Sequence, residues 1–260
     1  MTSEFGGIRA VVTGGASGIG LATAQLLAER GATVACLDLN PDAVPAPLLG
    51  IHADVSDDAV AEAVAEAAAQ LGGIDVVVNN AGVGAQGTVE DNDLGEWRKV
   101  FEVNVLGMVR VARAALPWLR ASAQAGGHPA IVNTCSIAAT AGLPSRALYS
   151  ASKGAVYSLT LAMAADHIRD GIRVNCVNPG TADTPWVRRL LDSADDPAAE
   201  LAALNARQPT GRLVSAAEVA NTIAYLASPL SAATTGASIA VDGGMQGLRL
   251  RPAPDPKPSE

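Results

Sequence analysis

Residues 13–20 read Thr-Gly-Gly-Ala-Ser-Gly-Ile-Gly and lie between a strand-like run at 8–13 and a helical pattern at 19–30. Glycines allow backbone N–H groups to approach a pyrophosphate, and the N-terminus of the following helix would direct its positive dipole end at that anion. The spacing of Gly14, Gly18 and Gly20 differs from the G-x-G-x-x-G fingerprint of dinucleotide-binding proteins. Taken alone, the motif fits either a phosphate-binding turn or a structural glycine turn.

Apolar strand-like runs alternate with helical patterns along the rest of the chain. We expect strands at 8–13, 33–37, 51–54, 76–79, 130–134, 172–178 and 238–241, and helices at 19–30, 60–71, 94–120, 148–169, 185–207 and 216–226. Several strands are near-continuous Val/Ile/Leu runs, as expected where helices cover both faces of a sheet. The alternation predicts one α/β domain over 1–250 with a Rossmann-type, doubly wound parallel sheet of about seven strands.

Prolines mark the irregular parts of this plan. Pro41, Pro45 and Pro47 leave little or no room for a helix between the second and third strands, and Pro117 predicts a bend in the long helix. Proline at every second position of 252–258 predicts an extended or disordered tail over 251–260.

Composition excludes several classes of protein. The 260 residues carry a formal net charge of −8, so the basic footprint of a nucleic-acid-binding protein is missing. We find no signal-peptide pattern and no long apolar run, which predicts a cytoplasmic protein without a membrane span. The three cysteines, Cys36, Cys135 and Cys176, are each expected to fall in a strand and to be buried, reduced thiols. The three histidines are scattered, so no metal site is predicted.

Asp38 favours a nucleotide cofactor. It ends the second strand, where a carboxylate can bind both ribose hydroxyls of NAD. The same carboxylate would repel the 2′-phosphate of NADP, and neither Ser17 nor Leu39 supplies a basic side chain for that phosphate. We therefore predict NAD rather than NADP. The alternative is a turn or cap residue, since Asn40 and Pro41 follow.

Tyr149 and Lys153 are spaced i, i+4 and would share one face of a helix. A free phenol is a poor base at neutral pH, but a nearby ammonium stabilises the phenolate. Tyr149 could then take a proton from an alcohol while hydride leaves for NAD. Ser136 lies just beyond the strand at 130–134, at the strand end where open α/β sheets bind ligands, and could hold the substrate oxygen. Such a spacing alone is common on surface helices, and a serine at this place is often a cap.

The assembled pattern resembles the classical short-chain dehydrogenase/reductase family over about residues 5–246. The resemblance rests on ordered motifs: 13–20, Asp54-Val55, Asn79-Asn80-Ala81-Gly82, Asn104, Ser136, Tyr149, Lys153, Asn178-Pro179-Gly180 and Asp242-Gly243-Gly244. It implies a catalytic set in which Tyr149 is the acid/base, Lys153 binds the nicotinamide ribose, Ser136 orients the substrate and Asn104 holds a water in a proton relay. Family members are usually tetramers, so a homotetramer is expected.

The resemblance also implies which residues contact NAD. They belong to six motifs spread along the chain, and comprise Gly14, Ser17, Gly18, Ile19, Gly20, Asp38, Leu39, Asp54, Val55, Asn80, Ala81, Gly82, Tyr149, Lys153, Pro179, Gly180, Thr181 and Thr184. Asp54 and Val55 would contact adenine, and the segment from Pro179 to Thr184 would hold the nicotinamide carboxamide. Asn79 is expected to be a turn or sheet-linking residue.

The substrate is predicted from Arg146, Trp186 and Arg207, in segments similar to a subgroup that oxidises 3-hydroxybutyrate, L-fucose or 2-keto-3-deoxy-L-fuconate. Arg146 and Arg207 could clamp a carboxylate bidentately, assisted by Arg188 or Arg189, or be ordinary surface residues. Trp186 could close over the substrate or pack in the lid. A small hydroxy acid or deoxy-sugar acid is therefore expected. The alternatives are a 3-oxoacyl or keto reductase, and a dinucleotide-sensing binding protein.

Overall fold

The computed structural model describes residues 3–192 and 194–251, so most of the predicted proline-rich tail, 251–260, lies outside the described residues. The main strands are β1 (Arg9–Thr13), β2 (Thr33–Asp38), β3 (Leu49–His52), β4 (Val76–Asn79), β5 (Ala130–Thr134), β6 (Arg173–Pro179) and β9 (Ser238–Val241). The main helices are α1 (Gly18–Glu29), α2 (Val60–Leu71), α3 (Leu94–Phe101), α4 (Gly107–Gln124), α5 (Ala147–His167), α6 (Pro185–Asp192), α7 (Pro197–Ala206) and α8 (Ala216–Ala227). Each expected strand is present within about two residues of its predicted ends.

The seven main strands form one sheet in the order β3-β2-β1-β4-β5-β6-β9. Every pairing within this sheet is parallel, from Val12 beside Val78 in β1 and β4 to Val177 beside Ile239 in β6 and β9. The chain first builds outward from β1 to β3 and then crosses back to β4, so the strand order reverses between β1 and β4. This reversal opens a crevice at the carboxyl ends of the strands, and the prediction of a doubly wound Rossmann-type sheet is confirmed.

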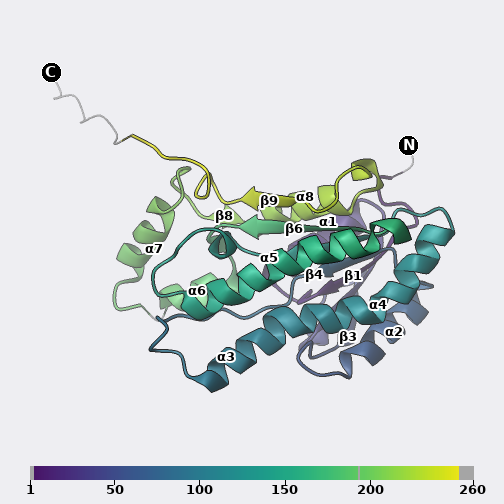
Figure 1. The fold of residues 1–260 in the computed structure, drawn as a ribbon, viewed down its shortest axis with the longest axis horizontal. Coiled ribbons are helices and arrows are strands. Elements are labelled where there is room, and N and C mark those ends of the chain that lie inside the picture. The colour runs from purple at the N-terminus through teal and green to yellow at the C-terminus, as the bar shows by residue number, and fades with distance from the viewer. Residues whose placement is uncertain (1–2, 193, 252–260) are drawn as a thin grey trace.

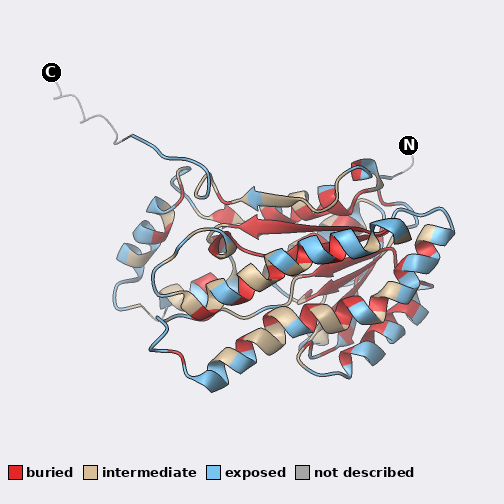
Figure 2. Cartoon of the chain, in the orientation of Figure 1, coloured by how far each residue is buried: buried red, intermediate tan, exposed pale blue. Residues whose placement is uncertain are grey.

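Helices cover both faces of the sheet, as Figure 1 shows, and an apolar layer lies between the sheet and the helices on each face. One layer packs α2, α4 and α5 on the face that carries Val11, Val77 and Ile131. The other packs α1 and α8 on the face that carries Val12, Val78 and Val132. Because successive strand residues point to opposite faces, adjacent valines enter different layers and the inner strands are buried throughout, as their red colour in Figure 2 shows.

The long predicted helix at 94–120 is interrupted, but not where the sequence suggested. A π-helix, Glu102–Leu106, separates α3 from α4, whereas the helix runs unbroken past Pro117. The amide of Asn104, inside the π-helix, donates to the carbonyl oxygen of Val83 at 2.9 Å and accepts from its N–H at 2.8 Å. A π-helix inserts an extra residue into the turn, and here it aims Asn104 at the loop after β4. The bend expected at Pro117 stays a prediction, whereas the π-helix is a feature that the sequence did not predict.

A lid follows β6 and carries α6 and α7. Its two ends are joined by a small sheet that the sequence did not reveal, in which β7 (Ala182–Asp183) pairs in parallel with β8 (Val214–Ser215). Directly after β8, Ser215 and Glu218 form a capping box that starts α8. The remaining short elements are 3-10 helices at Pro41–Ala43, Ile137–Ala139, Ile168–Asp170 and Pro229–Ser231. The first confirms that only a short helix fits between β2 and β3.

The cysteines lie in the core. Cys36 is in β2, Cys176 is in β6, and Cys135 comes directly after β5 rather than in a strand; all three are buried and free. None of the helices in the described ranges is long and apolar enough to cross a membrane. Within those same ranges, no group of three or more His, Cys, Asp or Glu residues is arranged so that it could hold a metal ion.

Candidate active site

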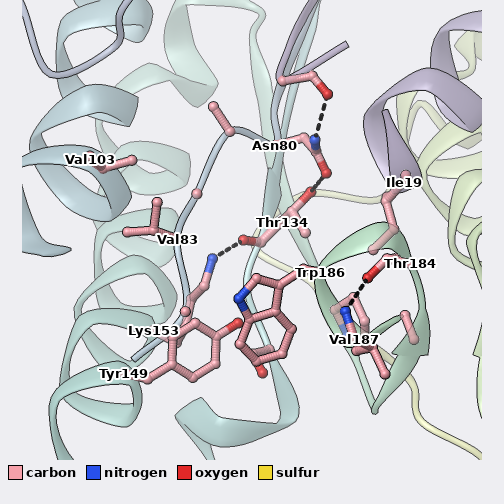
Figure 3. Close-up of a pocket in the computed structure, with 18 of the residues that line it drawn as sticks. Ile19, Asn80, Val83, Val103, Thr134, Tyr149, Lys153, Thr184, Trp186 and Val187 are labelled. Atoms are coloured by element: carbon pink, nitrogen blue, oxygen red, sulfur yellow. Dashed lines mark hydrogen bonds between the residues drawn. The ribbon is translucent and has the colours of Figure 1, made fainter. Parts of the chain in front are cut away.

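A cavity of about 1080 Å³ runs along the carboxyl ends of the strands and is covered by the lid (Figure 3). Its walls come from the turn after β1, the ends of β2 and β3, the loops after β4 and β5, the first turns of α5, and the lid. The crevice thus lies where the strand order reverses, the place where open α/β sheets bind ligands. Most of the predicted site residues line it.

The glycine-rich turn leaves its helix terminus available to an anion. α1 begins at Gly18, its N-cap Ser17 makes no side-chain capping bond, and its first turn holds no acidic residue. Gly14 and Gly18 have φ of +66° and +55°, and a Cβ on Gly20 would overlap the carbonyl oxygen of Gly14. Only glycine suits these positions, and the unpartnered N–H groups fit the diphosphate of a dinucleotide. Ile19 also lines the cavity.

Asp38 faces the cavity while it also organises the turns beside it. One carboxylate oxygen accepts from the N–H of Ala16 at 3.0 Å, and the other accepts from the N–H of Asn40 at 3.0 Å. Its two interpretations, turn residue and ribose ligand, are therefore compatible, since each oxygen has a further lone pair. Leu39 beside it is exposed and lines the same end of the cavity.

Asp54 and Val55 complete the end of the cavity nearest β3. The Asp54 carboxylate accepts from the hydroxyl of Ser56 at 2.6 Å and from its N–H at 2.8 Å. These hydrogen bonds lower the pKa of Asp54, with the Ser56 hydroxyl the largest cause. Val55 packs against Gly107 at the start of α4, which holds this turn in place.

The loop after β4 is tied to both neighbouring strands. Thr13 Oγ1 accepts from the N–H groups of Asn80 at 2.9 Å and Ala81 at 3.0 Å, and the Asn80 amide donates to the Thr13 carbonyl at 3.1 Å. Thr134 Oγ1 donates to Asn80 Oδ1 at 3.3 Å. Asn79 links β4 to β5 through Asn133 at 2.9 Å, as expected of a sheet-linking residue. Asn80, Ala81 and Gly82 therefore form a fixed rim of the cavity.

Tyr149, Lys153 and Ser136 all line the cavity. Lys153 is 3% exposed, its Nζ donates to the Thr134 carbonyl at 2.9 Å, and Nζ lies 5.8 Å from the centre of the Tyr149 ring. No carboxylate in residues 3–192 or 194–251 forms a salt bridge with Lys153. Its positive charge is thus left to stabilise an anion formed beside it, such as a phenolate. The Ser136 hydroxyl accepts from Ala138 N at 3.1 Å, so it caps a 3-10 turn as well as lining the cavity.

Asn104 differs from the other members of the predicted catalytic set. It is fully buried, and its amide bonds to Val83 and donates to Ser152 Oγ at 3.1 Å. The side chain does not line the cavity. In this geometry Asn104 fixes the loop after β4 against α5 at Ser152, three residues after Tyr149. A water-holding role for it therefore stays a prediction, and the side-chain amide is already engaged.

The segment from Pro179 to Thr184 crosses the cavity from β6 into the lid. Pro179, Gly180, Thr181 and Thr184 all line the cavity. Thr184 Oγ1 accepts from Val187 N at 3.5 Å, as Figure 3 shows. A Cβ on Gly18 would lie 3.6 Å from the Thr184 methyl group, so the lid reaches the glycine-rich turn on the far side of the crevice.

Three arginines line the cavity. They are Arg146, at the N-cap of α5, Arg189 in α6, and Arg207, at the C-cap of α7. Burial lowers the pKa of Arg146, and the neighbouring charge of Arg207 lowers it further. Arg188, which the sequence offered as an alternative helper, instead pairs with Asp183 at 3.1 Å and lies outside the lining. Two like charges held close together favour the binding of an anion between them.

Several lining residues escaped sequence reasoning. Gly84, Leu143 and Leu204 carry no chemical signal, and the Thr134 carbonyl that holds Lys153 belongs to the backbone. The sequence offered either Arg188 or Arg189 as the residue that assists the carboxylate clamp. Helix periodicity could have shown which of the two faces the cavity. It is one residue from Arg188, which rotates it by about 100° around the helix and toward the cavity.

Comparisons with known proteins place this site in a family. A family model described as Enoyl-(Acyl carrier protein) reductase matches residues 14–246, which contain the glycine-rich turn, Tyr149 and Lys153. The chain is a classical short-chain dehydrogenase/reductase. The resemblance stated from the sequence motifs is thereby confirmed.

Three proteins illustrate what this short-chain dehydrogenase/reductase is similar to. It is 43% identical to a cis-4-hydroxycyclohexanecarboxylate dehydrogenase of Sinomonas cyclohexanicum, over 90% of this chain and 95% of the relative. The solved structure of an aldohexose dehydrogenase of Thermoplasma acidophilum has a TM-score of 0.90 at 31% identity, covering 98% of this chain and 100% of that one. A 3-ketoacyl-(acyl-carrier-protein) reductase of Brucella melitensis, solved with NADH, has a TM-score of 0.85 at 31% identity, covering 93% and 99%.

These relatives establish the reaction class of the short-chain dehydrogenase/reductase. It is an oxidoreductase that acts on CH–OH groups. Its family typically binds a nicotinamide dinucleotide, and the glycine-rich turn, Asp38 and the rim at Asn80–Gly82 suit such a molecule.

Proposed function

We propose that this dehydrogenase uses NAD to interconvert the secondary alcohol of a hydroxy carboxylate and the corresponding ketone. The observation that carries the proposal is the pair Arg146 and Arg207, which line the same cavity as Tyr149 and form no salt bridge with any described residue. Guanidinium groups bind carboxylates through two parallel hydrogen bonds. A substrate that reaches both the catalytic hydroxyls and this pair needs a hydroxyl at one end and a carboxylate at the other.

The chain's own residues would perform the proton chemistry. Ser136 and Tyr149 would hydrogen-bond the substrate hydroxyl, and Tyr149 would accept its proton. Lys153, fixed by the Thr134 carbonyl, would stabilise the phenolate that accepts this proton. Bound NAD supplies the acceptor for the hydride that leaves the carbinol carbon. The alcohol then becomes a ketone with the loss of one proton and one hydride, and the reverse reaction returns both.

Asp38 supports NAD over NADP because its carboxylate stands at the end of β2 inside the cavity and Leu39 beside it is not basic. We expect Asp38→Ala to raise the KM for NAD by roughly 10- to 100-fold, since a charge-assisted hydrogen bond contributes about 1.5–3 kcal/mol. Without the carboxylate that repels the 2′-phosphate of NADP, the preference of the enzyme for NAD over NADP should also become smaller. Initial rates of reduction at 340 nm with both cofactors check this, with exposed Asp42→Ala, outside the cavity, as the control. If the unmodified chain used NADP as efficiently as NAD, the assignment of NAD as the cofactor would be contradicted.

The arginine pair makes a second prediction. Arg146→Ala and Arg207→Ala should each lower kcat/KM for a hydroxy acid by roughly 10- to 100-fold, because each removes a charged hydrogen-bond donor. The same variants should leave neutral secondary alcohols within about threefold of their original rate. Arg188→Ala, which breaks only the exposed pair with Asp183, is the matched control. If these variants lost kcat/KM equally for hydroxy acids and for neutral alcohols, the proposed carboxylate site would be contradicted. The assignment of the catalytic residues would not be affected.

The relatives support this reading and define its competitors. The name of the Sinomonas relative describes a substrate with one hydroxyl and one carboxylate. The two structural relatives are named for a neutral aldohexose and for a 3-ketoacyl thioester. An assay panel should therefore contain cis- and trans-4-hydroxycyclohexanecarboxylate, 3-hydroxybutyrate, cyclohexanol, glucose and an acetoacetyl thioester. Preference for the thioester would favour the keto-reductase alternative.

Three further expectations stay proposals: a single domain over 1–250, a cytoplasmic location and a homotetramer. β9 supports an assembly, since it ends the main sheet and its outer edge pairs with no described strand. An exposed sheet edge invites pairing with another copy. Light scattering of the purified chain tests the tetramer directly, and a monomer at all concentrations would contradict it.

A further inference from the structure

The indole of Trp186 packs directly against Gly84 at the substrate side of the cavity. The tryptophan begins the lid helix α6, and Gly84 lies in the loop after β4. A Cβ on Gly84 would lie 2.7 Å from Cε2 of the indole and closer still to Cζ2. Its φ is outside the left-handed region, so the missing side chain, rather than backbone freedom, is what this contact requires. The indole therefore has its present position because residue 84 is glycine.

The indole also faces the catalytic centre. Both Trp186 and Tyr149 line the cavity, and Figure 3 shows the indole pointing toward Tyr149 and Lys153. Trp186 is 40% exposed, so it is not absorbed into the packing of the lid. Of the two roles offered by the sequence, closing over the substrate and packing in the lid, the first fits this position better.

The neighbouring walls on this side are apolar too. They consist of Ile137, Leu143, Val187, Leu190 and Leu204. The carboxylate and carboxamide side chains among the described lining residues are Asp38, Asp54, Asn80 and Glu102. Asp38 and Asp54 follow β2 and β3, Asn80 follows β4, and Glu102 is bridged through Arg110 to Asp58 beyond β3. Asp38 and Asp54 thus lie at the end of the crevice formed by β2 and β3. The Asn80 amide is engaged by Thr13 and Thr134, and Glu102 is held by Arg110.

This distribution limits the substrate's polar groups. A hydroxyl group is satisfied only when it both donates and accepts hydrogen bonds. The arginines can donate but cannot accept, and Ser136, Tyr149, Thr181 and Thr184 are the described lining hydroxyls near the lid, two of which the reaction itself uses. Extra hydroxyls on a substrate would therefore face mainly indole and leucine side chains. Of the described lining side chains near the lid, Thr181 and Thr184 would be left as acceptors, so the unsatisfied hydroxyls weaken binding. A hydrocarbon body would instead bury its surface there.

We propose that the Trp186–Gly84 contact forms an apolar wall that restricts the substrate to hydroxy carboxylates with a hydrocarbon body and disfavours sugar acids. The inference rests on the proposed function, because it takes Arg146 and Arg207 as the carboxylate site. It narrows the expectation from the sequence, which admitted deoxy-sugar acids equally.

A matched pair of rings tests the substrate class on the unmodified chain. 4-Hydroxycyclohexanecarboxylate and 3,4,5-trihydroxycyclohexanecarboxylate share the carboxylate, the ring and the reacting hydroxyl. We expect kcat/KM with NAD to be at least about 10-fold, and up to roughly 100-fold, higher for the monohydroxy ring, the range over which apolar pockets discriminate against a hydroxyl. A trihydroxy ring turned over equally well or better would overturn the inference. 3-Hydroxybutyrate and 3,4-dihydroxybutyrate provide the same comparison for open chains.

Cyclohexanol separates this inference from the proposed function. If kcat/KM for cyclohexanol equals that for the monohydroxy acid, the proposed carboxylate site is contradicted. The comparison between the monohydroxy and trihydroxy rings still tests the apolar wall. If no hydroxy acid is turned over, the proposed function fails and the inference falls with it.

Substitutions at both ends of the contact identify the wall itself. Trp186→Gln should lower the ratio of kcat/KM between the monohydroxy and trihydroxy rings by about 10-fold, because the amide supplies an acceptor, while Trp186→Phe should keep it within about threefold. Gly84→Ala, which displaces the indole, should shift the ratio in the same direction as Trp186→Gln. Gly247→Ala is the control, since its Cβ would meet nothing within 4 Å. An unchanged ratio in Trp186→Gln and Gly84→Ala, with NADH binding retained by fluorescence, would overturn the role of the wall.

Discussion

The Tyr149→Phe variant should lose roughly 10²- to 10⁴-fold in kcat, the range that a positioned acid/base contributes. Phenylalanine keeps the ring and its place on α5 but has no hydroxyl to exchange a proton with the substrate. Lys153 keeps its hydrogen bond to the Thr134 carbonyl, so the cavity should retain its shape. Affinity for NAD, measured by NADH fluorescence titration, should therefore stay within about threefold of the original value.

Tyr225→Phe is the matched control for this loss. Its ring is 50% exposed on α8, its hydroxyl meets only Thr234 Oγ1 at 3.3 Å, and it lies outside the cavity. Its kcat should be unchanged. If Tyr149→Phe turned over substrate at the original rate, the acid/base assignment would be wrong. If the unmodified chain bound NAD but oxidised nothing in the panel, the dinucleotide-sensing alternative would gain support.

The Arg173→Met variant should destabilise the fold by roughly 3–5 kcal/mol, because it strands several buried carbonyl groups that each cost about 1–3 kcal/mol. Arg173 opens β6 and is 5% exposed. Its guanidinium donates to the carbonyls of Leu226 at 2.7 Å, Ala227 at 3.4 Å, Ser228 at 3.0 Å and Thr234 at 3.3 Å, and to Ser231 Oγ at 3.1 Å. Three of these acceptors end or follow α8, where a cation also complements the helix dipole.

Thermal unfolding followed by circular dichroism, at one protein concentration, measures this effect. For a chain of this size, about 2–4 °C of Tm accompanies each kcal/mol, so a drop of roughly 6–20 °C is expected. The Tm of Arg173→Lys should lie between those of the original chain and Arg173→Met, because one ammonium cannot replace the five donors of the planar guanidinium. Exposed Arg169→Met, four residues earlier, should change Tm by less than about 2 °C. A Tm for Arg173→Met within that range would show that the buried network adds nothing to stability.

Two features of the candidate site were visible in local sequence because their physical basis is local. Tyr149 and Lys153 share a helix face through i, i+4 spacing, and both do line the cavity. Asp38 ends a strand that a Val/Leu run predicts, and parallel strands direct their carboxyl ends to one edge. The π-helix between α3 and α4 was not predicted, for the opposite reason. The helix accommodates the proline, and the interruption nearby arises from the contact of Asn104 with Val83, which no local pattern records.

The alternation of strand and helix periods, the glycine-rich turn and the Tyr149–Lys153 spacing by themselves determined the doubly wound sheet, the family and the place of the crevice. Local backbone preference and side-chain periodicity suffice for these features. Tertiary structure alone decided that Arg146 and Arg207 line one cavity, that Trp186 rests on Gly84, and that Arg173 closes the end of α8. Each of these arrangements joins residues 53 or more positions apart, so it depends on how the lid, loops and helices pack.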